Sequence, residues 1–418
     1  MEIAINKSTL KVGVNKNIRR QVIGLFGFGN VGQGLYHVLQ GVPSSKAYIK
    51  KICVRQTNKE RNVEENLITY NPEVILNDPE INLVVELIDN PDDAYRYVKS
   101  ALLQGKSVVS GNKTMLAYHL DELIEIQQQT GNALLYDASA CGSIPIIRNL
   151  EEYYDNDLLI SIKGILNGSS NFILSRIFSH GENYDVALKK AQELGFAESN
   201  PSFDVMGFDA LYKLIILTVH GFGTYVNPND AFCYGIQNLS KYDIRYAQEQ
   251  NRKIKLVATL HKFDSNLFTL FVLPTLVKPS EYIFNVEDEF NGVVIEGAYY
   301  DEQFMFGKGA GGYPTGSAVL SDITARFHNY RYEYKKLNYF DAPLYTTDIA
   351  LELFIRYHNA DDLSVFDIKE QLVERYNGPE HRWVIAKVKL STLLNVKDLL
   401  PGLNVFIAYT GNYEVLTK

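Results

Sequence analysis

Two groups of residues in this sequence have types and spacings that could do chemistry. The first is Gly27-Phe28-Gly29-Asn30-Val31-Gly32, which matches the pattern GxGxxG. Such glycines allow a tight turn, a close approach of backbone to a pyrophosphate, and close packing of a helix on a strand. A plain glycine turn is the alternative. However, a mostly apolar run at 22–26 precedes the glycines and a helical pattern follows them, which favours a dinucleotide-binding turn.

The end of the next expected strand bears on which dinucleotide binds. In NAD sites, an acidic residue roughly 20 residues after the turn usually holds the ribose. Here the sequence reads Val54-Arg55-Gln56-Thr57-Asn58-Lys59, without a carboxylate. Arg55, together with Lys59, could pair with the 2′-phosphate of NADP, so we expect NADP to be preferred over NAD; the alternative is a solvated strand end.

The second group is a pair of opposite charges on an expected helix at 204–220. Asp209 and Lys213 are spaced i, i+4, so their side chains share a face. An exposed salt bridge is the usual outcome of this spacing. The rest of the helix is too apolar for a solvated surface helix, so we expect the charged stripe to face a cleft. Loops rich in hydrogen-bonding groups, at 167–171 and 195–201, precede it and are typical of binding sites.

The elements that would position the glycine turn alternate along the first part of the chain. Strand-like runs lie at 22–26, 49–55, 83–88, 107–110 and 133–136, with helix-like segments such as 91–103 and 115–129 between them. This alternation predicts an α/β fold with a Rossmann-like, doubly wound parallel sheet. We therefore expect residues 1–145 to form an NAD(P)-binding domain, to which the chain returns at about 306–330 through a second glycine cluster and a helix at 317–326.

The pattern changes after Pro145. We expect residues 146–305 to form an α+β domain for catalysis, substrate binding and oligomerisation, with strands at 160–166, 267–273 and 292–300, and helices at 171–178, 185–193 and 204–220. A linker at 328–343 should lead to a small C-terminal α+β unit at 344–418. Its expected elements are strands at 349–356, 383–390 and 405–409, a helix at 365–376 and a short helix at 392–400.

Composition excludes several classes of protein. The chain has 418 residues, of which 46% are hydrophobic and 22% charged, enough for two or three cored domains. Its formal charge is -8 and it has no Lys/Arg-rich block, which disfavours a nucleic-acid or membrane partner. It has neither a signal-peptide core nor a long apolar run, so we expect a cytoplasmic protein. Its three cysteines cannot form a disulfide framework.

Several segments together resemble the homoserine dehydrogenase family, over residues from about 21 to 326. The most specific stretch runs from Lys163 through Asn167-Gly168-Ser169-Ser170-Asn171 and residues 191–198 to Asp204, Asp209 and Lys213. Shorter matches lie at Gly111-Asn112-Lys113, at 138–145 and at 307–315. The resemblance implies an NAD(P)H-dependent enzyme that reversibly reduces L-aspartate 4-semialdehyde to L-homoserine in threonine and methionine biosynthesis, working as a homodimer or homotetramer.

The resemblance also implies roles for individual residues. Lys213 would donate or accept the proton, Glu198, Asp204 and Asp209 would hold the substrate, and Lys113 would sit between cofactor and substrate. Gly195 and Gly311, in two of the matching loops, would lie at the cofactor. The chemistry agrees, because hydride delivery to an aldehyde builds negative charge on oxygen that an ammonium can stabilise and protonate. Lys213 and Lys113 both qualify on this ground.

In this family the segment after the strand at 133–136 resembles a monovalent-cation site for Na⁺. Its ligands would be mainly backbone carbonyls, at Asp137, Ala140, Gly142 and Ile144. An ordinary interdomain hinge is the alternative.

The sequence departs from the family at two places. Asn200 stands where the family usually has Asp, although the neighbouring acids remain. The C-terminal unit, which would be a degenerate ACT-like domain, has Asn359-Ala360-Asp361-Asp362 in place of the Asp-x-Pro-Gly effector turn. We therefore expect threonine to inhibit weakly or not at all.

Two rival functions remain open at this stage. Cys141 could be the nucleophile of an acylating semialdehyde dehydrogenase, but no partner histidine is evident and a free cysteine usually packs as a small apolar residue. A nucleotide sensor without catalysis would have no need of Glu198, Asp209, Lys213 and Lys113 together. His220, at the end of the same helix, could reach the site, but we expect it to face the last carbonyls of the helix.

Overall fold

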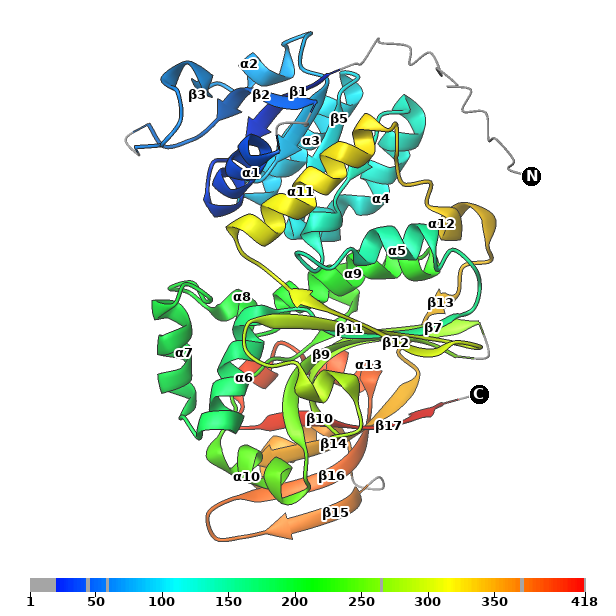
Figure 1. Ribbon diagram of the computed structural model, residues 1–418. Helices are drawn as coiled ribbons and strands as arrows, with labels where there is room; N and C mark the ends of the chain where they lie inside the picture. Colours follow the sequence, from blue (N-terminus) through cyan, green and yellow to red (C-terminus); the bar gives the residue numbers. More distant parts are fainter. Residues whose placement is uncertain (1–19, 43–45, 58–59, 264–265, 369–371, 417–418) are drawn as a thin grey trace, which may run out of the picture.

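Two β-sheets, with helices packed on and between them, make up the molecule (Figure 1). The computed structural model describes residues 20–42, 46–57, 60–263, 266–368 and 372–416. Within these residues, no helix combines the length and the apolar character needed to cross a bilayer.

The first sheet has six strands, all parallel, in the order β3-β2-β1-β4-β5-β6. This is the order of a dinucleotide-binding Rossmann fold, so the predicted fold class is confirmed. Its strands are β1 (Gln21–Phe26), β2 (Ala47–Cys53), β3 (Ile68–Thr69), β4 (Leu83–Glu86), β5 (Ser107–Ser110) and β6 (Leu134–Leu135). Its helices are α1 (Asn30–Gly41), α2 (Glu73–Leu76), α3 (Pro91–Leu103) and α4 (Lys113–Thr130), with a short 3-10 turn, η1 (Glu65–Leu67).

The chain later returns to this sheet through α11 (Gly312–Phe327), which packs against α1. Glycines on both helices allow the close contact. A Cβ on Gly34 would lie 2.0 Å from the Gly312 carbonyl oxygen, and one on Gly316 would lie 2.6 Å from the Leu35 nitrogen. Any side chain at either position would push the helices apart.

The second sheet begins with five strands in the order β12-β11-β7-β9-β10, all antiparallel to their neighbours. They are β7 (Leu159–Ile165), β9 (Lys253–Lys262), β10 (Leu267–Val277), β11 (Phe290–Gly297) and β12 (Asp301–Lys308). The helices of this part are α5 (Ile146–Glu152), α6 (Gly168–His180), α7 (Tyr184–Glu193), α8 (Ser202–Val205), α9 (Phe208–Phe222) and α10 (Lys241–Glu249). Short elements are η2 (Asp137–Ser139), η3 (Pro228–Asp230), β8 (Phe232–Cys233) and η4 (Tyr282–Asn285).

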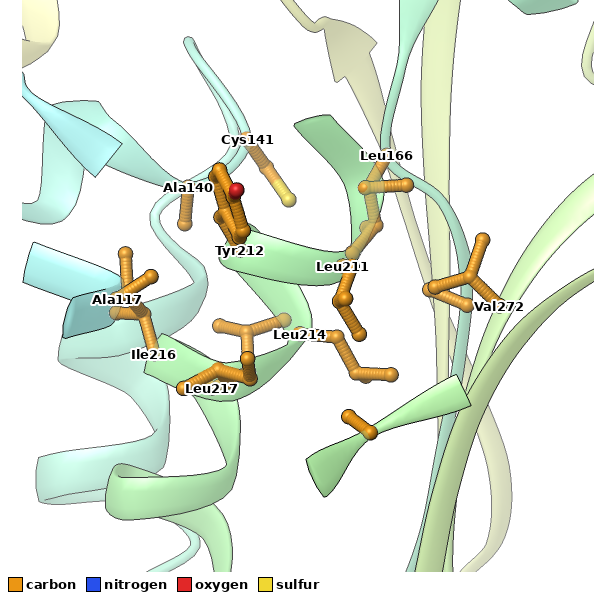
Figure 2. Close-up of a cluster of buried hydrophobic side chains, with 14 of the residues drawn as sticks. Ala117, Ala140, Cys141, Leu166, Leu211, Tyr212, Leu214, Ile216, Leu217 and Val272 are labelled. Atoms are coloured by element: carbon orange, nitrogen blue, oxygen red, sulfur yellow. The ribbon is translucent and has the colours of Figure 1, made fainter. Parts of the chain in front are cut away.

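Helix α9 is the centre of the molecule, because it is packed on both sides. Figure 2 shows Ile216 and Leu217 on the side of Ala117 in α4, and Leu211 turned toward Val272 in β10. Every residue from Asp209 to Phe222 is buried. The apolar composition of this helix therefore reflects burial between two layers, and the polar residues at its ends need partners.

The C-terminal strands extend the second sheet. The elements β14 (Ile349–Tyr357), η5 (Ala360–Phe366), β15 (Leu372–Asn377), β16 (Arg382–Lys389), α13 (Leu390–Val396), η6 (Leu400–Gly402) and β17 (Phe406–Val415) follow one another. Their sheet order is β17-β14-β16-β15, that of a ferredoxin-like βαββαβ unit. Strand β17 pairs with β10 at Thr275 and Tyr409, so this unit continues the second sheet.

One expected helix in this unit is wrong. Residues 365–376 were expected to be helical, but the chain forms a 3-10 segment up to Phe366 and the strand β15 from Leu372, and residues 369–371 lie outside the described residues. All six side chains of β15 are exposed, and it pairs with β16 alone among the described strands. Pairing at a sheet edge has overridden a composition rich in helix-forming residues.

The segment expected to be a linker is also packed. It contains α12 (Lys335–Tyr339) and leads to β13 (Leu344–Tyr345), which pairs with β10. Tyr332 and Tyr334 are buried. The chain thus crosses between the two sheets at residues 140–146, 308–312 and 328–344.

Candidate active site

The glycine turn between β1 and α1 is shaped to receive a phosphate group. Gly27 has φ +93°, and a Cβ there would lie 2.4 Å from the Leu87 carbonyl oxygen. A Cβ on Gly32 would lie 2.6 Å from the Gly27 carbonyl oxygen, so the first and third glycines are required by packing. A Cβ on Gly29 would meet nothing within 4 Å. The middle glycine therefore faces open space at the N-terminus of α1, where a pyrophosphate fits.

A cavity of about 380 Å³ extends from this turn to the end of β2. Arg55 and Gln56 line it, as expected, and so do Arg61 and Tyr70. Arg61 was not predicted from the sequence, because it lies in an irregular segment after β2, where residue spacing does not indicate which side chains face a cavity. Lys59 lies outside the described residues. The acidic residues on the wall, Asp89 and Asp93, follow β4, so among the described residues no carboxylate lines the cavity at the end of β2.

The remaining predicted cofactor residues lie around the same turn, except Gly195 and Lys113, which begins α4. Asn30 and Val31 begin α1, and Phe28 is buried beside the glycines. Gly311, with φ +122°, precedes α11, and a Cβ on the next residue, Gly312, would lie 2.6 Å from Asn30 Oδ1. The chain's return thus brings Gly311 to the glycine turn. Gly195 lies instead on the exposed loop after α7, with φ +76°.

Asp209 bridges two lysines that lie on different helices, Lys113 on α4 and Lys213 on α9. Its Oδ2 lies 2.7 Å from Lys213 Nζ, one turn further along α9, and its Oδ1 lies 2.7 Å from Lys113 Nζ, at the start of α4. Lys213 Nζ also donates to the Leu166 carbonyl at 2.7 Å. The side chain of Lys213 is 8% exposed and that of Lys113 is 34% exposed. The sequence pair is therefore not a surface salt bridge.

Asn167 holds the acidic side of this cluster in place. Its side-chain nitrogen donates to Asp204 Oδ1 at 2.7 Å and to Asp209 Oδ2 at 2.9 Å. Its side-chain oxygen accepts from the Ser170 N–H at 2.8 Å and so caps α6. One amide therefore fixes two carboxylates and a helix end. Lys113 Nζ also lies 5.6 Å from the ring centre of Phe203.

The charges in the cluster support one another. Burial favours the neutral acid, but Lys113 and Lys213 hold the pKa of Asp209 well below its usual range. Burial opposes the charge on Lys113, but Asp209 outweighs it and raises the pKa of Lys113, with further contributions from Asp204 and Glu198. Burial and the charge of Asp209 raise the pKa of Asp204. The site therefore contains an ionised Asp209 beside two ammonium groups.

Glu198 lies at the exposed mouth of the cluster. Its charge acts on Lys113, and its backbone carbonyl accepts from the Gln192 side chain at 3.0 Å. Asn200, where the family usually has Asp, accepts from the backbone N–H of Ser202 at 3.2 Å and from its hydroxyl at 2.8 Å. The amide oxygen at this position thus serves the turn before α8, a role that an Asp could also fill.

Comparison with known proteins identifies both parts of the chain. Residues 145–324 match the family described as homoserine dehydrogenase, and residues 27–137 match its NAD-binding domain. The chain is 33% identical to the homoserine dehydrogenase of Bacillus subtilis over 362 residues, which is 82% of each chain.

The chain belongs to the homoserine dehydrogenase family.

Solved structures agree with this assignment. The structure of a homoserine dehydrogenase from Thiobacillus denitrificans superposes with a TM-score of 0.79 and 29% identity, covering 95% of this chain and 98% of that one. A hyperthermophilic archaeal homoserine dehydrogenase in complex with NADPH superposes with a TM-score of 0.65 and 26% identity, covering 75% of this chain and 99% of that one. As a member of this family, the protein is an oxidoreductase that acts on a small molecule.

Cys141 is poorly placed to act as a nucleophile. It is fully buried, and Figure 2 shows it in an apolar cluster beside Tyr212 and Leu166. Burial raises the pKa of the Cys141 thiol to about 12, so almost no thiolate forms at neutral pH. The acylating mechanism is therefore disfavoured.

We expected His220 to face the last carbonyls of α9, but its ring nitrogens contact other groups, which also lie outside the cluster around Asp209. Its Nδ1 lies 2.6 Å from Glu151 Oε1 on α5, and its Nε2 lies 2.8 Å from the Tyr136 hydroxyl. The Tyr136 hydroxyl also lies 3.1 Å from that of Tyr334, and Glu151 accepts from the Tyr334 N–H at 3.1 Å. This network ties the segment after α11 to both sheets.

Hydrogen bonds hold the loop expected to bind a cation in this chain. Asp137 Oδ1 accepts the N–H groups of Ile147 at 2.9 Å and Arg148 at 3.2 Å. Gly142 has φ +57°, and the Ser143 N–H donates to the Lys308 carbonyl at 2.9 Å.

Among the described residues, no three His, Cys, Asp or Glu side chains gather around a possible metal position. Backbone carbonyls at Asp137, Ala140, Gly142 and Ile144 would need no such group. The Na⁺ site stays a prediction.

Proposed function

We propose that the protein catalyses the reversible reduction of L-aspartate 4-semialdehyde to L-homoserine, with NADPH preferred over NADH, in threonine and methionine biosynthesis. The observation that carries this proposal is the carboxylate of Asp209, which bridges Lys213 and Lys113 at 2.7 Å each. Such a cluster keeps two ammonium groups beside a buried acid, between the first sheet, which carries the glycine turn, and the second sheet. This is what the reduction of an aldehyde to an alcohol requires of the protein.

Lys213 is the proposed proton donor to the new alkoxide. An ammonium has three N–H donors, and within the described residues two of them are directed to Asp209 and to the Leu166 carbonyl. The third is left for the substrate oxygen. Because Asp209 and Leu166 fix the direction of the amine, Lys213 is oriented before the substrate arrives, which lowers the cost of reaching the transition state. In homoserine oxidation the neutral amine would accept the same proton.

The acidic side of the cluster would bind the α-ammonium of the substrate. Glu198 is exposed at the mouth, and Asp204 is held by Asn167 at 2.7 Å. A carboxylate is the natural partner of an ammonium group. Lys113, whose side chain is 34% exposed, is the first residue of α4. It lies between this acidic side and the first sheet.

The cofactor would bind along the glycine turn and supply the hydride. The open space at Gly29, the N-terminus of α1, and the cavity lined by Arg55 and Arg61 all fit a dinucleotide with a 2′-phosphate. The archaeal relative whose structure holds NADPH supports the same nicotinamide chemistry.

The decisive experiment is a spectrophotometric assay of NADPH and NADH oxidation with L-aspartate 4-semialdehyde. We expect turnover with both cofactors and a lower KM for NADPH. Arg55→Ala should raise the KM for NADPH more than that for NADH. The difference should correspond to the loss of one charge-assisted contact, about 1.5 to 3 kcal/mol of binding free energy. Arg20→Ala, at the start of the described chain, is the matched control. Equal effects of Arg55→Ala on both cofactors would show that Arg55 does not bind the phosphate.

The assembly is proposed on family resemblance to be a homodimer or homotetramer. Light scattering of the purified protein would decide it, and a mass of 47.4 kDa, that of one chain, would exclude both.

A further inference from the structure

A buried acid at the edge of the first sheet takes no part in the chemistry described so far. Glu86 is the last residue of β4 and pairs in register with Ser110, the last residue of β5. Both residues are fully buried. Burial raises the pKa of Glu86 to about 7, and the groups that act on it next most strongly are Ser110, Ile88 and Asp89, with no cation among them. Hydrogen bonds must therefore compensate for the burial of this carboxylate.

The carboxylate of Glu86 joins two loops at the edge of the first sheet. Its Oε1 accepts the Ile88 N–H at 2.8 Å, in the loop after β4, and its Oε2 accepts the Ser110 hydroxyl at 2.5 Å. Residues 87–90 line the cavity beside the glycine turn. The side-chain nitrogen of Asn112 donates to the Ile88 carbonyl at 3.0 Å, so the same two loops are joined a second time.

A chain of hydrogen bonds leads from this carboxylate to the start of α4. The Ser110 hydroxyl, which donates to the carboxylate, accepts the Asn112 N–H at 3.1 Å. The side-chain oxygen of Asn112 accepts the Met115 N–H at 2.9 Å and so caps α4. Lys113 directly follows this cap, and its Nζ lies 2.7 Å from Asp209. The buried carboxylate is therefore connected to the lysine through two intermediate residues.

An ionised carboxylate gives each donor in this chain an acceptor. Because both of its oxygens accept, Ser110 can donate its only hydroxyl proton to Glu86 and still accept from Asn112. The variant Glu86→Gln keeps the shape of the side chain but accepts at one atom only. If its amide oxygen stays on the Ile88 N–H, its amide nitrogen donates to Ser110, and the hydroxyl proton of Ser110 loses this acceptor.

We propose that Glu86 is a positioning residue that fixes Lys113 beside Asp209, acting through Ser110 and Asn112. When the Ser110 hydroxyl is no longer held, the cap of α4 shifts and the Lys113 ammonium moves away from Asp209. The inference rests on the proposed function in giving Lys113 a role at the substrate, but the positioning itself is measurable without turnover.

Acylation of Lys113 at a series of pH values, followed by peptide mass spectrometry, tests the positioning. Asp209 raises the pKa of Lys113, so a lysine that has moved away loses its proton at a lower pH. Ser110→Ala breaks the chain of hydrogen bonds without altering any charge, and its curve should move to lower pH by about one unit. Glu86→Gln should give a similar shift, and the double variant should shift no further, because both substitutions break one chain. Glu125→Gln, at an exposed position on α4, is the matched control and should leave the curve unmoved.

The steady-state assay supplies an independent readout. Both variants keep an acceptor for the Ile88 N–H, so the KM for NADPH should change by less than about twofold, while kcat should fall by about tenfold to a hundredfold as Lys113 is displaced. A loss of stability alone would lower the folded fraction, measured by circular dichroism, and would leave the acylation curve of the folded protein unmoved.

The neutral substitution decides the outcome. An unmoved Lys113 curve in Ser110→Ala would overturn the proposal, and this variant is sufficient if Glu86→Gln does not fold. A shift in Glu86→Gln alone would also overturn it, because the lost charge acting at a distance would then explain the effect. A wild type without turnover, together with shifted acylation curves in the variants, would contradict the proposed reaction and support the positioning role.

Discussion

The two ends of α9 carry buried polar clusters that use their hydrogen-bonding groups differently. Near the N-terminal end, Lys213 binds Asp209 and the Leu166 carbonyl, and one of its three donors is left over within the described residues. Seven residues later, His220 has both ring nitrogens engaged, by Glu151 and Tyr136. The first cluster opens to Lys113, which is 34% exposed, and the second is closed. Two polar residues on the same helix can therefore differ in what they offer a substrate. Lys213 has a spare N–H donor in a cluster that reaches solvent at Lys113, whereas His220 has none.

The largest expected effect on this comparison comes from Lys213→Ala. If its ammonium protonates the alkoxide, kcat for semialdehyde reduction should fall by about 10² to 10⁴-fold while NADPH binding stays nearly intact. Lys213→Arg should be nearly as damaged, because a guanidinium keeps its proton. Lys189→Ala, at an exposed lysine on α7, is the matched control. Wild-type kcat in a folded Lys213→Ala variant would pass the role to Lys113, and the same assay of Lys113→Ala would decide it.

A substitution in the His220 cluster should lower the stability of the protein and leave its catalytic rate nearly unchanged. His220→Ala leaves Glu151 buried without its imidazole partner, so the free energy of unfolding should fall by about 3 kcal/mol. The kcat of the protein that remains folded should change by no more than about threefold. Urea unfolding, with the exposed His180→Ala as control, measures the first effect, and a steady-state assay measures the second. A hundredfold loss of kcat at wild-type stability would contradict the structural role.

A smaller effect should appear in the protonation of Lys113. In the wild type, Asp209 raises the pKa of Lys113, so the amine keeps its proton to a higher pH than an ordinary lysine. Asp209→Asn removes that charge and leaves burial, which favours the free amine, so the curve should move to lower pH. Acylation of Lys113 as a function of pH, followed by peptide mass spectrometry, reports the free amine, with Lys189 in the same digest as internal control. An unmoved curve would mean that Asp209 does not control this lysine.

The smallest expected effect is none at all. Cys141 lies near Lys213 but is buried, with a pKa raised to about 12. A thiol-blocking reagent should therefore leave reductase activity unchanged over minutes at neutral pH. Rapid inactivation that the Cys141→Ala variant resists would reopen the acylating mechanism.

Sequence patterns predicted those parts of the molecule in which local spacing carries the signal. The glycine turn at Gly27–Gly32 and the pair of Asp209 and Lys213 depend on residues a few positions apart, and both are formed as expected. The alternating strands and helices up to residue 136 depend on periodicity. The strands and helices that we predicted there were found, whereas β3 and α2 were not predicted, because two and four residues are too few to show a period.

Contacts between distant segments left no such signal. The Leu166 carbonyl, which fixes Lys213, is a backbone atom that any residue would supply. Asn167 was noted as part of a polar loop, but its bridge to Asp204 and Asp209 depends on packing across α6, α8 and α9. Strand β15 is defined by a neighbour, β16, so its own composition misled the assignment of a helix.

The three passages of the chain between the sheets have a mechanical consequence. The first two touch, since the Ser143 N–H donates to the Lys308 carbonyl at 2.9 Å, and the third is anchored where Tyr334 meets Glu151. Two bodies joined by a single strand of chain can swing apart, as in many hinged enzymes. Three crossings restrict the movement of one sheet relative to the other more than a single crossing would.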